Sequence, residues 1–133
     1  MDVPKKLNRS LKKLAAEGEE PVLIFPALLE RFASEQMKAM VRIGMGEDVR
    51  IFSYMVVTDR NVHFISPGML WDKVRSVPLD KVDGIEYVNE FHNNALKLKI
   101  GPAAEGIIFY DDLEGVRFFK HIKNYLESRK TKA

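Results

Sequence analysis

The middle of this chain is a succession of short apolar runs separated by turn residues, and the end of the chain has a different hydrophobic period. β-Branched and aromatic residues gather in these runs, and Gly, Asn, Asp and Pro stand between them, a pattern typical of antiparallel strands and their turns. In residues 96–100 (LKLKI) apolar and basic side chains alternate strictly. Such alternation places one face of a strand in a core and the other in water. The sequence therefore predicts a sheet of consecutive antiparallel strands.

About seven strands are predicted, with a helix after them. The strand ranges are 37–43, 49–58, 62–66, 71–77, 84–91, 95–100 and 106–110. We expect the Asn93-Asn94 pair to form a tight hairpin turn, because asparagine tolerates positive φ. From Leu113 to Leu126 apolar residues recur every three or four positions, with Asp111 or Asp112 available as the helix cap. The apolar side of this helix is wide, so we expect it to cover an open edge or end of the sheet.

The first 35 residues are predicted to be a helical extension. Three leucines lie at helical spacing among lysines and arginines, which indicates a short basic amphipathic helix: Leu7, Leu11 and Leu14. A second set at helical spacing follows Pro21: Leu28, Leu29 and Phe32. Residues 22–25 suit either a helix or a strand. We therefore expect a helical segment over residues 1–35 and one sheet domain over residues 36–130, since no linker-like composition or repeat divides the chain.

The absence of cysteine excludes several kinds of site. No disulfide, cysteine-ligated zinc, iron–sulfur cluster or thiol nucleophile is available. The three histidines lack H-x-x-x-H spacing, and no serine lies in a Gly-x-Ser-x-Gly motif. Gly44-Met-Gly46 is followed by two acidic residues, which would repel a phosphate group. We therefore expect no catalytic residues, no metal and no cofactor.

The net charge and the hydropathy of the chain limit where the protein can reside and what it can bind. The formal net charge is only +2, so no overall field favours nucleic acid. The longest apolar stretch, residues 22–29, is shorter than the roughly 20 residues that span a membrane, and the N-terminus lacks a signal-like apolar core. We expect a cytoplasmic protein that binds no nucleic acid. Aromatic residues beside basic ones in strands are also typical of RNA-stacking surfaces, but they more often fill a core: Phe52, Tyr54, Phe64 and Tyr110.

Two motifs resemble those of the bacterial pleckstrin-homology-like domains and, more distantly, of the GRAM domains. Residues 54–65 (YMVVTDRNVHFI) are similar to the family's hairpin, in which apolar residues precede Thr-Asp-x-Arg-apolar-x-Phe. Residues 77–82 (VPLDKV), followed by Ile85 and Glu86, are similar to the family's strand exit. One position departs from the pattern, because Asn61 stands where the family has its arginine.

The resemblance covers residues 36–128 and implies a fold. It is an α+β fold, mainly β, in which a pleckstrin-homology-like barrel of about seven antiparallel strands in two sheets is capped by a long C-terminal helix. Here a helical N-terminal segment would precede the barrel.

The resemblance also implies a non-catalytic binding or assembly module. The leading hypothesis is protein–protein interaction or homo-oligomerisation, and the alternative is peripheral binding to an anionic lipid surface. In lipid-binding members basic residues of the first two strands contact the headgroup, and those positions hold Lys38, Arg42 and Arg50 here. Lys12 and Lys13 of the N-terminal helix are further candidate lipid contacts, unless that helix packs on its own sheet. Met69, Leu70 and Trp71 form a candidate partner patch, although a buried Trp71 fits the sequence equally well.

Overall fold

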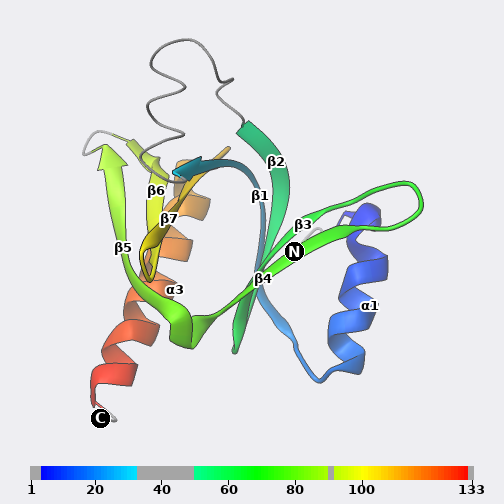
Figure 1. Cartoon of the computed structure of the whole chain (residues 1–133), viewed down its shortest axis with the longest axis horizontal. Coiled ribbons are helices and arrows are strands. Elements are labelled where there is room, and N and C mark those ends of the chain that lie inside the picture. Colours follow the sequence, from blue (N-terminus) through cyan, green and yellow to red (C-terminus); the bar gives the residue numbers. More distant parts are fainter. Residues whose placement is uncertain (1–3, 33–49, 90–91, 132–133) are drawn as a thin grey trace.

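The computed structural model describes residues 4–32, 50–89 and 92–131, which form a sheet of seven antiparallel strands with helices on opposite sides (Figure 1). The strands are β1 (Pro21–Phe32), β2 (Arg50–Thr58), β3 (Asn61–Ser66), β4 (Lys73–Pro78), β5 (Val82–Asn89), β6 (His92–Ile100) and β7 (Ala103–Phe109). The helices are α1 (Asn8–Ala16) and α3 (Asp112–Thr131), with short 3₁₀ turns at Lys5–Leu7 and Leu79–Lys81. No helix within these described ranges is long and apolar enough to cross a membrane.

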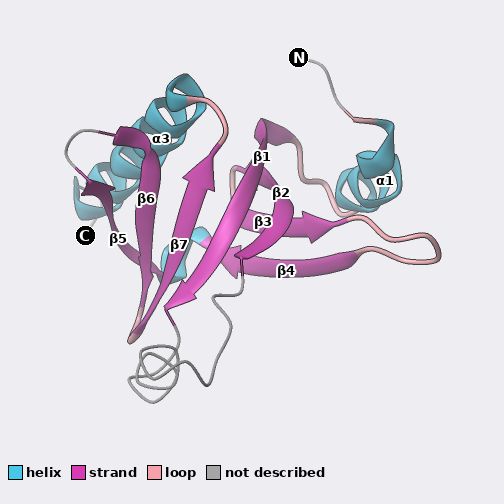
Figure 2. Cartoon of the chain, turned by 90° about the horizontal axis from the view of Figure 1, so that it is seen from above, coloured by secondary structure: helices cyan, strands magenta, loops and turns pink. Residues whose placement is uncertain are grey.

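The strands follow the order β4-β3-β2-β1-β7-β6-β5, so β1 lies in the middle of the sheet. The sheet is strongly bent, and β3 and β4 run across the direction of β6 and β7 (Figure 2). The prediction of seven antiparallel strands with a C-terminal capping helix and a short N-terminal helix is confirmed. The prediction of two separate sheets is corrected, because β1 pairs with β2 on one edge and with β7 on the other.

The central strand β1 corrects the prediction that the helical N-terminal segment continues past Pro21. Residues 21–32 are a strand and not a helix, so the sheet begins before the predicted boundary at residue 36. Phe25 and Ala27 of β1 face the main core, while the intervening Ile24 and Pro26 lie on the other side. A strand that is apolar on both faces lacks the alternation that would reveal it, which explains the error. The strand predicted at residues 37–43 lies outside the described residues.

A second correction concerns the hairpin between β5 and β6. Asn93 and Asn94 are not turn residues, since both belong to β6, which pairs His92 with Asn89. The side chain of Asn94 donates a hydrogen bond to the carbonyl oxygen of Phe109 on β7. Asn94 therefore connects β6 to β7 instead of forming the turn between β5 and β6.

The main core lies between the bent sheet and α3. Phe118, Ile122 and Leu126 of α3 pack on the inner side chains of the strands, and Phe118 and Ile122 are fully buried. Inside the bend the guanidinium of Arg75 on β4 forms a 2.6 Å ion pair with the buried Glu105 carboxylate on β7. These strands are not neighbours in the sheet, so the ion pair joins its two halves across the interior.

A smaller apolar cluster lies on the opposite face of the sheet, under α1. Leu7 and Leu14 are buried there against Val56 of β2 and Ile65 of β3. The apolar side of the basic N-terminal helix is therefore covered by the chain's own sheet.

Candidate interaction surface

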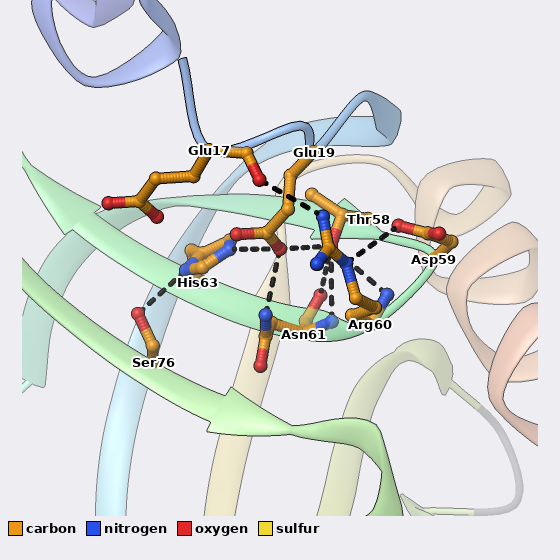
Figure 3. Close-up of polar contacts among 8 residues, drawn as sticks. All are labelled: Glu17, Glu19, Thr58, Asp59, Arg60, Asn61, His63 and Ser76. Carbon is orange, nitrogen blue, oxygen red and sulfur yellow. Dashed lines mark hydrogen bonds and ion pairs between the residues drawn. The ribbon is translucent and has the colours of Figure 1, made fainter. Parts of the chain in front are cut away.

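A buried carboxylate follows α1 and holds the connection between α1 and β1. Glu19 is 5% exposed, and its Oε1 accepts hydrogen bonds from Thr58 Oγ1 (2.7 Å), Asn61 Nδ2 (2.8 Å) and His63 Nε2 (3.1 Å) (Figure 3). Desolvation raises the pKa of Glu19, but the hydrogen bonds from Asn61, Thr58 and His63 outweigh it and lower the pKa to about 2. Glu19 therefore carries its charge at neutral pH.

The same cluster orders a serine, a histidine and a glutamate as in a catalytic triad. His63 Nδ1 lies 2.6 Å from Ser76 Oγ, while Nε2 of the ring faces Glu19 (Figure 3). A serine nucleophile also needs donors that stabilise an oxyanion beside it. The contacts of the described residues bring no such donor to Ser76 Oγ. The Glu19 oxygen that faces His63 is shared with Thr58 and Asn61, as expected of a structural anchor.

The hairpin motif between β2 and β3 supplies most of this anchor. Thr58 Oγ1 also accepts hydrogen bonds from the backbone N–H groups of Arg60 and Asn61, which fixes the turn. The guanidinium of Arg60 donates to the carbonyl oxygen of Glu17 at the end of α1. The hairpin motif of residues 54–65 therefore also fastens the N-terminal helix.

A second carboxylate, Asp72, holds the start of α1 to the β3–β4 loop. Its Oδ2 accepts a 2.6 Å hydrogen bond from Ser10 Oγ, and its Oδ1 accepts one from the Gly68 N–H. Arg9 lies 3.6 Å from Oδ1 and also donates to the carbonyl oxygen of Met69. The Ser10 hydrogen bond lowers the pKa of Asp72 against the cost of desolvation, with further lowering from the Gly68 N–H and Arg9.

The loop that Asp72 holds displays three adjacent apolar side chains, which we call the hairpin tip (residues 69–71). Met69 is 97% exposed, Leu70 is 80% exposed and Trp71 is 67% exposed. They line a shallow open depression of about 370 Å³ together with Ser66, Pro67, Gly68 and Lys73. The structure thus places the predicted partner patch in solvent and decides against a buried Trp71.

The conformation of the loop depends on a glycine. A Cβ atom at Gly68 would lie only 2.3 Å from the carbonyl oxygen of Trp71. Only glycine allows this close approach of two backbone segments. Asp72 and Gly68 therefore hold the hairpin tip in one shape.

Sequence reasoning favoured a core position for Phe52, Tyr54 and Tyr110, but their rings form a cluster on the outer side of the sheet, which we call the aromatic face. Phe52 packs edge-on against Tyr54 with ring centroids 5.2 Å apart, and its ring lies 6.2 Å from that of Tyr110. Phe52 is 43% exposed and Tyr110 is 59% exposed. The sequence predicts that the aromatic residues of the strands fill a core. This prediction holds for Phe64, which is buried, and is wrong for Phe52 and Tyr110, which are exposed.

The predicted lipid-contact residues do not form a described site. Lys38 and Arg42 lie outside the described residues. Arg50 begins β2, where its backbone pairs with Glu30. Lys12 and Lys13 are exposed on α1. Contact of these five residues with lipid stays a prediction.

Comparison with known proteins identifies the fold. No protein-family model and no curated protein sequence matches the chain. A solved structure of the DH/PH fragment of PDZRHOGEF in complex with human RhoA matches 95% of the chain with a TM-score of 0.63 and 9% identity. An N-terminally truncated linker-DH/PH fragment of p115-RhoGEF matches 91% with a TM-score of 0.61 and 10% identity. This chain spans 34% of the length of each of these two chains.

A third match is a domain of comparable size. The C-terminal domain of an unknown protein from Leishmania infantum aligns over 92% of both chains, with a TM-score of 0.52 and 17% identity. At these identities the matches show the fold alone. The fold is pleckstrin-homology-like.

Proposed function

We propose that this chain is a non-catalytic protein-interaction module that contacts its partner through the hairpin tip. The observation that carries the proposal is the exposure of Met69, Leu70 and Trp71 on one short loop. Burying a large apolar side chain contributes about 1.5–3 kcal/mol, so a partner that covers all three gains a substantial driving force. Tryptophan is enriched among the residues that carry most of the binding energy of interfaces, and methionine is enriched in interface cores.

The way the loop is held supports this proposal. Asp72 fastens the loop to α1 through Ser10 and Arg9, and Gly68 packs against the Trp71 carbonyl group. A surface that already has its bound shape loses less conformational entropy on binding. A contact surface benefits from such fixing, whereas a mere connecting loop does not require it.

The comparisons support the class of partner. The PDZRHOGEF fragment, which shares the fold, is complexed with another protein, human RhoA. The Glu19–His63–Ser76 cluster is accounted for as an anchor of α1, which supports a binding role without catalysis.

We also propose that the chain is one of the bacterial pleckstrin-homology-like domains, because of its two motifs, and that it resides in the cytoplasm.

Site-specific photocrosslinking in cells that express the full chain tests the proposal. A photoreactive phenylalanine analogue at Leu70 is expected to form covalent protein adducts, and Trp71→Asp in the same chain is expected to abolish them. The matched control carries the analogue at Lys12, an exposed residue of α1 that is not part of the loop. Adducts equal at both positions would contradict the proposal.

Vesicle binding examines the lipid alternative in the same variants. The chain could float with phosphatidylserine vesicles, lose this binding in Trp71→Asp and form no protein adduct at position 70. That result would identify a membrane surface, and not a protein, as the partner of the hairpin tip. Flotation lost instead in a Lys12→Glu, Lys13→Glu double variant would favour the basic residues of α1 as lipid contacts.

A further inference from the structure

We propose that the partner of the hairpin tip is a second copy of this chain, which receives the tip on its aromatic face. This inference rests on the proposed function, because it names the partner of the same surface. It follows from three properties that the two surfaces share or complement: exposed apolar area, ring chemistry and charge.

The aromatic face offers enough apolar surface to receive a tip. Phe52 and Tyr110 are both strongly exposed, and their rings are in contact. Leu28 on β1 pairs with Phe52 on β2 and with Ile108 on β7. The half-buried side chains of Leu28 and Ile108 therefore lie on the same side of the sheet as Phe52. Three neighbouring strands therefore build one apolar surface beside α1, whose cluster includes Tyr54.

The ring chemistry of the two surfaces is complementary. The face presents the rings of Phe52 and Tyr110, and the tip presents an indole, a thioether and an isobutyl group. Aromatic pairs favour edge-to-face or offset contact, and methionine sulfur packs favourably against ring edges. The tip of one copy can thus bury its three side chains against rings that are otherwise in water.

The charges around the two surfaces have opposite signs. Near the tip, Lys73 follows Asp72 directly, and Arg9 is bonded to the loop, with Lys5 and Lys6 in the turn before it. Asp72 is already paired and its side chain is only 5% exposed. The cations near the tip therefore lie beside no exposed carboxylate of the loop itself.

The aromatic face ends in an acidic segment. Asp111 and Asp112 follow Tyr110 directly and are exposed, and Glu114 lies two residues further on. Desolvation, and after it the charge of Asp111, raises the pKa of Glu114, although Arg117 opposes the effect. Basic residues around the tip of one copy would meet these carboxylates on the other, which favours association and fixes its orientation.

Both surfaces adjoin α1, so two copies can exchange their tips. Such an exchange gives two identical contacts and closes as a dimer with two-fold symmetry. Each contact joins a tip to a face and never a tip to a tip. A mixture of two complementary variants therefore distinguishes this arrangement from other modes of self-association.

The experiment measures self-association of the full chain by light scattering and sedimentation over a range from about 1 μM to about 1 mM. The tip variant is Leu70→Asp with Trp71→Asp, the face variant is Tyr110→Asp, and Lys12→Ala is the control. We expect the wild type and Lys12→Ala to dimerise, and each of the first two variants to weaken dimerisation by about tenfold or more. All the altered side chains are exposed, and unchanged urea midpoints would confirm that each variant folds.

The decisive sample is an equimolar mixture of the tip variant and the face variant. We expect it to form a one-to-one dimer more tightly than either variant alone, because the intact tip of one meets the intact face of the other. A mixture that stays monomeric while the wild type dimerises would overturn the inference in favour of another contact.

The inference and the proposed function fail in different ways. A wild type that stays monomeric up to about 1 mM overturns the second copy as partner. If crosslinking at position 70 then yields adducts with a different protein, the proposed function survives. If it yields no adducts, both fail together.

Discussion

The two sides of the sheet hold their helices by different means. The 20-residue helix α3 is held mainly by apolar burial, with Phe118 and Ile122 fully enclosed. The 9-residue helix α1 buries fewer apolar side chains and adds two carboxylates, Glu19 and Asp72, one at each end. A helix this short is not stable alone, so tertiary contacts must fix it. Polar anchors do this with less apolar area, and one of them also holds the hairpin tip.

The largest expected effect tests the α3 side. Replacing Phe118 by Ala leaves a cavity in the main core, and we expect the free energy of unfolding to fall by about 3–5 kcal/mol. Urea denaturation followed by circular dichroism measures the change. Lys123→Ala, at an exposed position of the same helix, is the control and should change stability little. A loss below about 1 kcal/mol for Phe118→Ala would show that apolar burial does not dominate on this side.

The next expected effect is slightly smaller. It tests the polar anchor of α1 through the dependence of stability on pH. The pKa of Glu19 is lowered from its ordinary value of 4.5 to about 2 in the folded chain. A carboxyl group with a lowered pKa stabilises the fold fully above its unfolded pKa, and this stability is lost as the pH falls through the folded pKa. We expect a loss of about 3 kcal/mol as the pH falls from above 4.5 to about 2.

Glu19→Gln separates this effect from the titration of other carboxylates. The variant keeps an oxygen acceptor but has no charge, and we expect it to be about 1–3 kcal/mol less stable at neutral pH. The stability difference between the wild type and Glu19→Gln should shrink as the pH falls, as measured by urea denaturation at each pH. A difference that is independent of pH would mean that the charge of Glu19 contributes nothing.

The contrast between the two sides also explains what could be predicted from the sequence. The strand β6 has one face in water and the helix α3 has one apolar side, so their hydrophobic periods are visible in the sequence and both were predicted. The strand β1 was not, because α1 and α3 cover opposite sides of the sheet and its apolar residues do not alternate. The role of Glu19 was not predicted, since its partners Asn61 and His63 are 42 and 44 residues away in the sequence. Spacing along the chain carries no signal for such contacts.

A smaller effect tests whether α1 undocks alone. Leu14→Ala removes apolar contact under α1. We expect the free energy of unfolding to fall by about 2 kcal/mol, which is at the low end for a buried leucine. Hydrogen exchange should accelerate in α1 while the amides of α3 stay protected. The reason is that α1 has few contacts through which its local unfolding would also unfold the sheet. Leu126→Ala, the matched change on α3, should accelerate exchange throughout. Equal acceleration everywhere in both variants would mean that the two sides unfold as one unit.

The smallest expected change in stability concerns the hairpin tip. Gly68→Ala forces the backbone apart, because the new Cβ would lie 2.3 Å from the Trp71 carbonyl oxygen. The loop is exposed, so we expect a loss of only about 1 kcal/mol. Trp71 is the single tryptophan of the chain, so its fluorescence emission should report the displaced tip directly.

Gly101→Ala gives the matched control for this change. Gly101 has a φ of 57° and no atom within 4 Å of an added Cβ, so the substitution costs about 1–2 kcal/mol through backbone strain alone. It should leave Trp71 emission and crosslinking at position 70 unchanged, whereas Gly68→Ala should shift the emission and weaken the crosslinking. If both variants leave the tip unchanged, the loop takes its shape without Gly68. The fixed shape of the tip would then no longer distinguish a contact surface from an ordinary turn, and only its exposed side chains would support the proposed function.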